Sequence, residues 1–271
     1  MSDDNKNKKQ SNSLKKDDVK NASELFQFIN RRSSGRIFHY TTYESLITII
    51  KSQSFRLTRL DLLNDKAEQT LISGFETDQN YIMSFCNSEK EYVSMWAMYG
   101  KSSGIKIRLD LSSKNLERVS FDNYFFDSNL TKNIPINSGK GTPFLDRDIQ
   151  LSDVVYLDKD TNSIKHNNNP FPNLVVDESL KKQLSGFLKY DAWEFEKERR
   201  LKITLNDDHQ KNSPQYIFMK LPDDFFSDFS ITYNPWVSKL LQEELIETLN
   251  RVTGREVTQR LSSNYGEISE L

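Results

Sequence analysis

Glutamates stand at alternate positions in the segment 193–200, where Glu194, Glu196 and Glu198 follow one another. On a β-strand all three carboxylates would share one face, whereas on a helix only the first and the last would. The apolar residues at 201, 203 and 205 continue as a strand pattern, so we expect the strand to have begun by Glu198. Carboxylates this close repel one another, and the arrangement is costly unless a cation or a donor-rich ligand offsets it. The segment therefore indicates a ligand site or, as the alternative, a solvated sheet edge balanced by its own Lys and Arg residues.

His39 is one of only three histidines in the chain. Residues 37–40 have the pattern of a short strand, and Thr41 with Glu44 forms a capping box that opens a helix. His39 is therefore expected at the end of a strand, just before a helix N-terminus, with Thr41 as the helix cap. Ligands that carry phosphate groups favour such places. The alternative is a histidine with a purely structural role.

A third candidate is the segment 94–100, which places Trp96 and Tyr99 beside Gly100. Core packing, with the glycine ending a helix, explains this segment on spacing alone. Cys86 is expected to be a small buried hydrophobe. Glu68 is expected to be a solvated helix residue.

The residue types available exclude several kinds of chemistry. With three His, one Cys and no HExxH or CxxC motif, a zinc site is not expected. No GxSxG motif is present, and the segment 139–142 lacks the residues that a P-loop needs. The formal net charge of −2 means that a nucleic-acid partner would need a local basic patch. A single cysteine excludes an internal disulfide.

The chain is expected to form one folded domain over residues 22–271, after a disordered polar tail at 1–21. Two irregular loops are expected near 121–150 and 161–172. No apolar run reaches the roughly 18 residues that cross a bilayer, and no signal peptide opens the sequence, so we expect no membrane partner and a cytoplasmic location.

Periodicity predicts the elements that must position the candidate residues. Strands are expected at 37–40, 81–85, 105–111, 201–205, 216–221, 229–233 and 256–261. Helices are expected near 24–29, 43–50, 89–98, 178–190 and 235–253, the last capped by Asn234 and ended by Gly254. Strands separated unevenly by helices favour the α+β class over a doubly wound sheet.

These segments together resemble a bacterial family known as a domain of unknown function, DUF2971. The matching stretches are 38–41 with its helix, 56–58 running to 64–65, 83–85, 94–104 and 193–201. A second, weaker resemblance lies in the order of a His-x-Thr motif with its helix, an aromatic segment with a tyrosine, and a Glu-x-Glu motif leading into a strand. This order is similar to that of the ADP-ribosyltransferase superfamily, in particular its members that modify DNA bases.

The second resemblance implies a fold and a set of roles. It implies a split, mixed or antiparallel β-sheet core with flanking helices, and NAD bound as a substrate in the cleft, without a metal. His39 would bond the adenosine ribose, Tyr99 would stack on nicotinamide, Glu198 would be catalytic and Glu196 would help the acceptor. The neighbouring residues Tyr40, Thr41, Ser94 and Trp96 would complete the NAD site.

The implied activity is transfer of ADP-ribose to a macromolecular acceptor, a nucleic acid or a protein, in phage defence or a toxin system. The chain lacks the Arg and Ser-Thr-Ser motifs of the arginine-modifying toxins. Two alternatives remain open: a non-catalytic module that binds a nucleotide or a protein, and a hydrolase of NAD or of nucleic acid.

Overall fold

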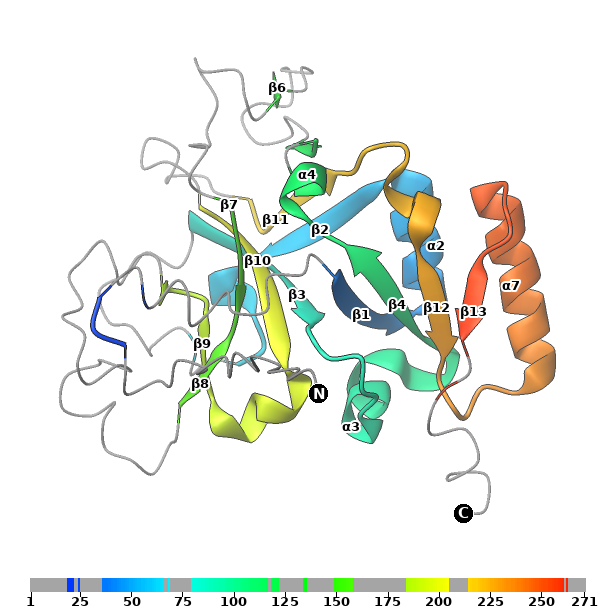
Figure 1. Cartoon of the computed structure of the whole chain (residues 1–271), viewed down its shortest axis with the longest axis horizontal. Coiled ribbons are helices and arrows are strands. Elements are labelled where there is room, and N and C mark those ends of the chain that lie inside the picture. Colours follow the sequence, from blue (N-terminus) through cyan, green and yellow to red (C-terminus); the bar gives the residue numbers. More distant parts are fainter. Residues whose placement is uncertain are drawn as a thin grey trace, which may run out of the picture.

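The computed structural model describes residues 19–21, 24, 36–65, 68, 79–116, 118–121, 134–135, 149–157, 184–204, 214–260 and 262. In these ranges a large, mainly antiparallel mixed sheet is combined with a few helices (Figure 1). The predicted α+β class is therefore confirmed.

The large sheet runs through most of the described chain. Its strands are β1 (Arg36–Thr42), β2 (Ser54–Arg59), β3 (Asn80–Cys86), β4 (Gly104–Asp110), β5 (Ser120–Phe121), β6 (Ile134–Pro135), β7 (Ile149–Asp153), β10 (Glu198–Thr204), β11 (Tyr216–Lys220), β12 (Ser230–Tyr233) and β13 (Thr258–Arg260). A second, parallel sheet pairs β8 (Val155–Leu157) with β9 (Leu188–Tyr190).

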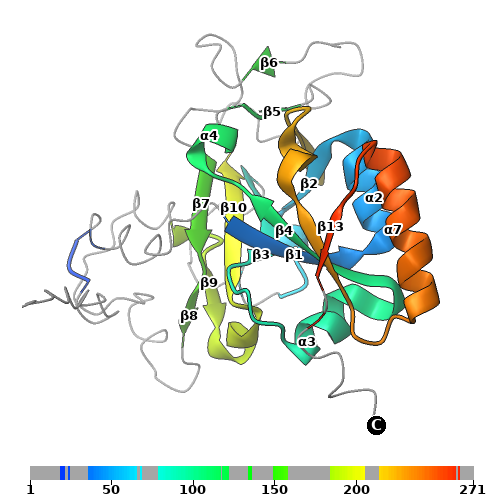
Figure 2. The ribbon, with the colours of Figure 1, turned by 45° about the vertical axis from the view of Figure 1, so that its right-hand side comes forward.

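The helical elements are short except for two. The α-helices are α2 (Tyr43–Ser52), α3 (Val93–Met95), α4 (Ser113–Leu116) and α7 (Lys239–Thr253). A π-helical turn forms η4 (Trp96–Gly100), and the 3-10 turns are η2 (Leu60–Leu62), η5 (Lys101–Ser103), η6 (Asp191–Glu196) and η8 (Phe225–Asp228). Figure 2 shows α2 and α7 side by side next to β12 and β13, and their buried leucines join the main core.

The sheet branches at β3. Strand β10 pairs with one edge of β3 along its whole length. Strands β1 and β2 share the other edge, β1 at Cys86 and β2 at Tyr81 and Ile82. Residues 83–85 therefore have no strand partner on that edge within the described chain, and β1 continues instead along β4. The divergence of β1 from β3 creates the space in which the candidate site lies.

Strand β10 is buried along its whole length, and its two faces differ. Leu201 and Ile203 point into the main apolar core. Because strand residues alternate between faces, Glu198 and Arg200 share the opposite face. The predicted strand is thus confirmed from Glu198 onward.

The cap of the first described helix is one residue later than predicted. Thr42, not Thr41, is the N-cap of α2, and its hydroxyl accepts a hydrogen bond from the backbone N–H of Ser45. Strand β1 runs through Thr42, so Thr41 is still a strand residue and its hydroxyl does not cap the helix.

The helix predicted over 89–98 is wrong in its first half, because α3 begins only at Val93. The reason is a buried cation: Lys106 Nζ donates to the backbone carbonyls of Glu89 and Lys90. Those carbonyls are therefore engaged by a side chain from β4, which competes with the helical hydrogen bonds that they would otherwise accept.

Two further helix predictions need correction. Residues 188–190, placed in a helix by their apolar spacing, form β9, and Gly186 before them has a φ of 80° that a helix does not allow. The last helix begins after Ser238 rather than after Asn234. Asn234 instead donates from its side chain to the Lys101 carbonyl. Gly254 ends this helix as predicted, in a left-handed conformation.

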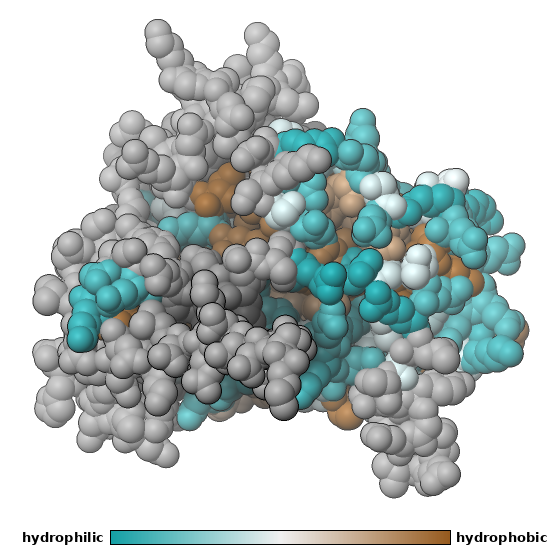
Figure 3. All heavy atoms as spheres, viewed as in Figure 1, coloured by the Kyte–Doolittle hydropathy of each residue, from teal (hydrophilic) through white to brown (hydrophobic). Residues whose placement is uncertain are grey.

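Other predictions fall wholly or mostly outside the described residues. These are the tail at 1–21, of which residues 19–21 are described and Val19 is fully buried, the helix near 24–29 and the loops near 121–150 and 161–172. No helix within the described ranges is long and apolar enough to cross a membrane. Figure 3 shows hydrophilic residues over much of the described surface on the side where α7 lies.

Candidate functional site

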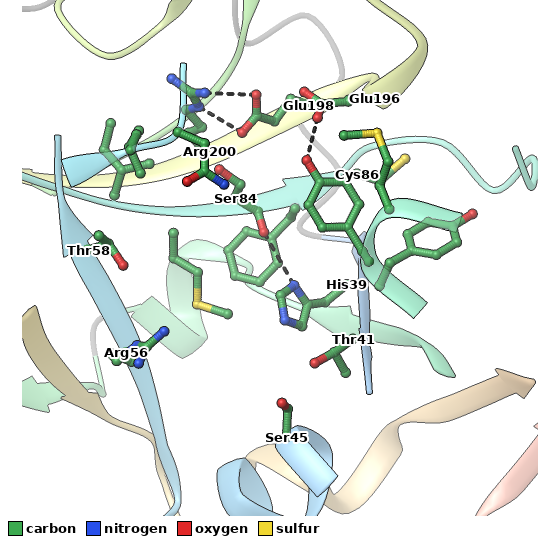
Figure 4. A pocket seen from close by; sticks show the side chains of 18 of the residues that line it. His39, Thr41, Ser45, Arg56, Thr58, Ser84, Cys86, Glu196, Glu198 and Arg200 are labelled. Carbon is green, nitrogen blue, oxygen red and sulfur yellow. Dashed lines mark hydrogen bonds and ion pairs between the residues drawn. The ribbon is translucent and has the colours of Figure 1, made fainter. Parts of the chain in front are cut away.

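A cavity of about 840 Å³ lies where β1 and β3 diverge (Figure 4). Its walls come from β1, α2, β2, β3, η4, β9, η6, β10 and β11, so residues from most of the described chain meet there. Cavities of this size suit ligands as large as a dinucleotide.

The structure brings together most of the residues predicted from the sequence. Six of the eight line this cavity: His39, Tyr40, Thr41, Tyr99, Glu196 and Glu198. Ser94 and Trp96 do not line it. Trp96 is fully buried in an apolar cluster, where its indole N–H donates to Glu91 at 3.2 Å, so the core-packing interpretation describes it.

Glu196 and Glu198 are both buried, with 3% and 5% of their surface exposed, which excludes the solvated-edge interpretation for them. The Nζ of Lys189 lies 2.5 Å from a carboxylate oxygen of Glu196 and 3.4 Å from one of Glu198. Glu194 differs from both: it is exposed and pairs with Lys197. Only two of the three alternating acids therefore belong to the cavity.

Arg200 holds the second acid from the same strand face. Its Nε and Nη2 donate to the two carboxylate oxygens of Glu198 at 2.8 and 2.9 Å. Its Nη1 and Nη2 also donate to the carboxylate of Glu68. Glu68 is 7% exposed, so the prediction that it is a solvated residue is wrong. A buried charge needs a partner of opposite charge, and the guanidinium of Arg200 is that partner for both Glu198 and Glu68.

The five charged groups form what we call the carboxylate cluster: Glu68, Glu196, Glu198, Lys189 and Arg200. With all five ionised, the cluster has a net charge of −1. Lys189 Nζ lies within 4 Å of all three carboxylates, where it occupies the centre of the cluster. Within the described residues no group of three or more His, Cys, Asp and Glu is placed to hold a metal ion.

The two acids facing the cavity have pKa values displaced in opposite directions. Burial and the charge of Glu198 raise the pKa of Glu196, against the opposing effect of Lys189. Burial also acts to raise the pKa of Glu198, but Arg200 and Lys189 outweigh it and hold that pKa below its usual range. Neighbouring acids separated in this way are typical of sites that need one permanent anion and one group that exchanges a proton.

Tyr99 reaches the cluster from the π-helical turn η4. Its hydroxyl donates to Glu196 Oε1 at 2.5 Å, and 40% of the residue remains exposed. Burial and the charge of Glu196 raise its pKa, so the hydroxyl stays a donor at neutral pH. π-Helical turns occur frequently at functional sites because they redirect side chains that an α-helix would place elsewhere.

His39 contacts β3 at the edge where residues 83–85 have no described strand partner. Its Nδ1 lies 3.3 Å from the carbonyl oxygen of Ser84, one of the β3 residues without a strand partner on that edge. A carbonyl only accepts, so Nδ1 is the donor. Burial lowers the pKa of His39 to about 4, and the ring is therefore neutral at pH 7, which leaves Nε2 as an acceptor. Figure 4 shows His39 between Ser84 and the side of the cavity that Thr41 and Ser45 line.

Sequence reasoning did not predict the charged residues Arg56, Glu68, Lys189 and Arg200 as part of the site, although all four line the cavity. Strand alternation was enough to place Arg200 beside Glu198. Arg56 was visible only as part of the 56–58 motif, because β2 was not predicted as a strand. No local pattern marked Glu68 or Lys189.

Comparison with known proteins adds no relative: no family model matches the chain, and no curated protein and no solved structure is significantly similar to it. The resemblances drawn from the motifs therefore stay predictions.

Proposed function

We propose that the chain is an ADP-ribosyltransferase that binds NAD in this cavity and transfers ADP-ribose to a nucleic acid or a protein. One observation carries the proposal: an acid with a lowered pKa, Glu198, shares a cavity with His39 and Tyr99, although the three come from distant parts of the sequence. The branching of the sheet at β3 supports an ADP-ribosyltransferase-like arrangement, in which NAD lies in the cleft of a split sheet.

The chemistry needs an anion beside the nicotinamide ribose. Nicotinamide leaves as a neutral molecule with the electron pair of the glycosidic bond, and the ribose becomes cationic as the bond breaks. Glu198 is anionic at neutral pH and the cluster around it has a net negative charge, so it stabilises that cation. In a partly closed cavity such an interaction is worth several kcal/mol in rough terms.

Glu196 would serve the second half of the reaction. A new bond forms between the ribose carbon and an oxygen or nitrogen of the acceptor, and the acceptor loses a proton. The raised pKa of Glu196 makes it the acid of the pair that takes up a proton more readily. Tyr99, which lines the cavity and is hydrogen-bonded to Glu196, would stack on nicotinamide.

The contacts of Glu198 also support a second function. Both of its oxygens already accept hydrogen bonds from Arg200, so the acid has a complete structural role without any substrate. A module that binds a nucleotide without reacting with it would keep the same cavity. The two functions differ in what replacing Glu198 does.

The deciding experiment incubates the protein with NAD labelled in its adenosine part and with cell lysate, and compares Glu198→Gln with Glu194→Gln. Glu194 is the matched control because it lies on the same segment but is exposed. Transfer of label by the wild type and by Glu194→Gln, lost at least a hundredfold in Glu198→Gln, supports the transferase. Nicotinamide release without labelled product would identify an NAD hydrolase instead. Unchanged biological activity of a folded Glu198→Gln variant, with no NAD consumed by either protein, would select the binding module.

A further inference from the structure

The side of the cavity away from the carboxylate cluster contains a cation that has no carboxylate partner among the described residues. Arg56, on β2, lines the cavity, and its guanidinium lies 4.7 Å above the ring of Tyr216. Lys189 and Arg200, the other two cations of the lining, are each bound to carboxylates. Figure 4 shows Arg56, Thr41 and Ser45 on one side of the cavity and Glu196, Glu198 and Arg200 on the other.

Thr41 adds a hydroxyl to the same side. The residue is 8% exposed and lines the cavity, and its hydroxyl has no hydrogen-bond partner within the described part of the chain. It is available because the neighbouring Thr42 caps the helix in its place. A hydroxyl that faces a cavity and makes no described hydrogen bond within the protein is free to donate to a ligand.

The other polar groups here are consistent with an anionic ligand. Ser45 lies at the start of the ten-residue helix α2, and the N-terminus of a helix favours negative charge. Thr58 stands two residues from Arg56 on the same strand face and also lines the cavity. Glu44 is the exception, because its carboxylate also lines the cavity and opposes an anion; it accepts a hydrogen bond from Ser103.

We propose that Arg56 and Thr41 form a phosphate subsite, in which the guanidinium and the hydroxyl donate to the oxygens of a phosphate group. A guanidinium presents its N–H groups as a planar fork, which suits phosphate oxygens. His39 lies two residues before Thr41 on β1, and the two side chains share one face of the strand. The neutral ring of His39 offers Nε2 as an acceptor to a ribose hydroxyl rather than to a phosphate. In the NAD complex, on which this assignment rests, the phosphate group is the pyrophosphate; the phosphodiester of a nucleic-acid acceptor has the same chemistry.

The test measures binding and needs no turnover. Calorimetry compares ADP-ribose, adenosine and a short single-stranded oligonucleotide as probes, with the wild type, Arg56→Gln, Arg56→Lys and Arg36→Gln. Arg36 is the matched control, because it lies on β1, is exposed and pairs with Glu89 outside the cavity. Thermal unfolding confirms that each variant is folded.

We expect Arg56→Gln to weaken ADP-ribose binding roughly tenfold to a hundredfold, the range for losing a hydrogen bond to a charged group. Adenosine affinity should stay unchanged in all variants, and Arg56→Lys should fall between the wild type and Arg56→Gln. If the oligonucleotide rather than ADP-ribose loses affinity, the subsite stands and binds the acceptor. Equal losses for ADP-ribose and adenosine, no effect of Arg56→Gln on either phosphate probe, or no binding of any phosphate probe by the wild type would overturn the subsite. Because these outcomes involve no bond breaking, they are independent of whether the wild type consumes NAD.

Discussion

The two sides of the cavity differ in whether their charged side chains are paired within the protein. On one side three carboxylates and two cations are buried and bound to one another, so every charged group there has a partner of opposite charge within the protein. On the other side Arg56 is exposed, and Thr41 keeps a hydroxyl without a described partner. Burial explains the difference, because a charge removed from water must be paired in the folded state, whereas an exposed cation remains solvated until a ligand arrives.

This contrast separates residues that hold the site in shape from residues that are available to a ligand. The carboxylate cluster ties together β9, η6 and β10 with Glu68, and its disruption should first be measured as lost stability. Arg56 and Thr41 contribute little to the folded state, so changes there should appear mainly in binding. The predictions below test this separation.

The largest effect is expected for Lys189→Met. Removing the central ammonium leaves three buried carboxylates with Arg200 alone, and we expect the free energy of unfolding to fall by about 3–5 kcal/mol, the usual cost of removing one partner of a buried ion pair. Urea denaturation measures it. Lys197→Met is the control, because Lys197 pairs with exposed Glu194 and should change stability by less than about 0.5 kcal/mol. Adding Glu196→Gln to Lys189→Met should restore part of the loss. Equal stability of the two lysine variants would contradict the cluster.

The second effect is the pH dependence caused by His39. Its pKa is about 4 in the folded protein and 6.5 as a free side chain, so between these values the unfolded chain binds a proton that the folded chain does not. Stability is therefore lost as the pH falls from about 6.5 to about 4, by up to about 3 kcal/mol, since one pKa unit corresponds to about 1.4 kcal/mol.

The matched variant for this prediction is His39→Asn, whose amide can still donate to the Ser84 carbonyl but does not titrate. Its unfolding free energy should fall less than that of the wild type between pH 6.5 and pH 4.5. Parallel curves for the two proteins would show that His39 is not buried in its neutral form.

A smaller effect is expected for Thr42→Val. This change removes the N-cap of α2 and should lower the free energy of unfolding by about 1 kcal/mol, because valine is a poor cap. Thermal unfolding measures it. No change in the melting temperature would mean that another group caps the helix.

The smallest effect on stability is expected for Thr41→Val, one residue away. The replacement has the same shape and removes a hydroxyl that has no described partner, so stability should change by less than about 0.5 kcal/mol or rise slightly. ADP-ribose affinity should nevertheless fall several-fold. A loss of stability as large as that of Thr42→Val, with unchanged affinity, would place Thr41 among the structural residues.

The strands that line the main core with alternate residues were predictable, whereas β2 and the short strands β5 to β9 were not predicted. Apolar residues at every second position mark β3, β4 and β10 directly, because one face of each strand packs into the core. Helix starts were less predictable. The turn at 89–92 and the one after Asn234 are decided by hydrogen bonds from Lys106 and to Lys101, which lie on other elements.

Two of the five residues of the carboxylate cluster were predicted, and a third could have been. Glu196 and Glu198 were candidates because their spacing is costly without compensation, and β-strand alternation places Arg200 beside Glu198. Lys189 could not be found, because it stands in the segment 178–190, whose apolar spacing predicts a helix. Glu68 could not be found either, because its local sequence is typical of a solvated helix residue. Their contribution depends only on what they meet in the folded chain.

The sequence by itself determined the α+β class, the faces of the strands and the order in which the candidate residues occur. The tertiary structure decided which of them meet, which carboxylate stays ionised and which hydroxyl is left for a ligand. The physical reason is that periodicity is a local property of the chain, whereas burial and charge pairing depend on contacts between segments up to about 130 residues apart, such as the pair of Glu68 and Arg200.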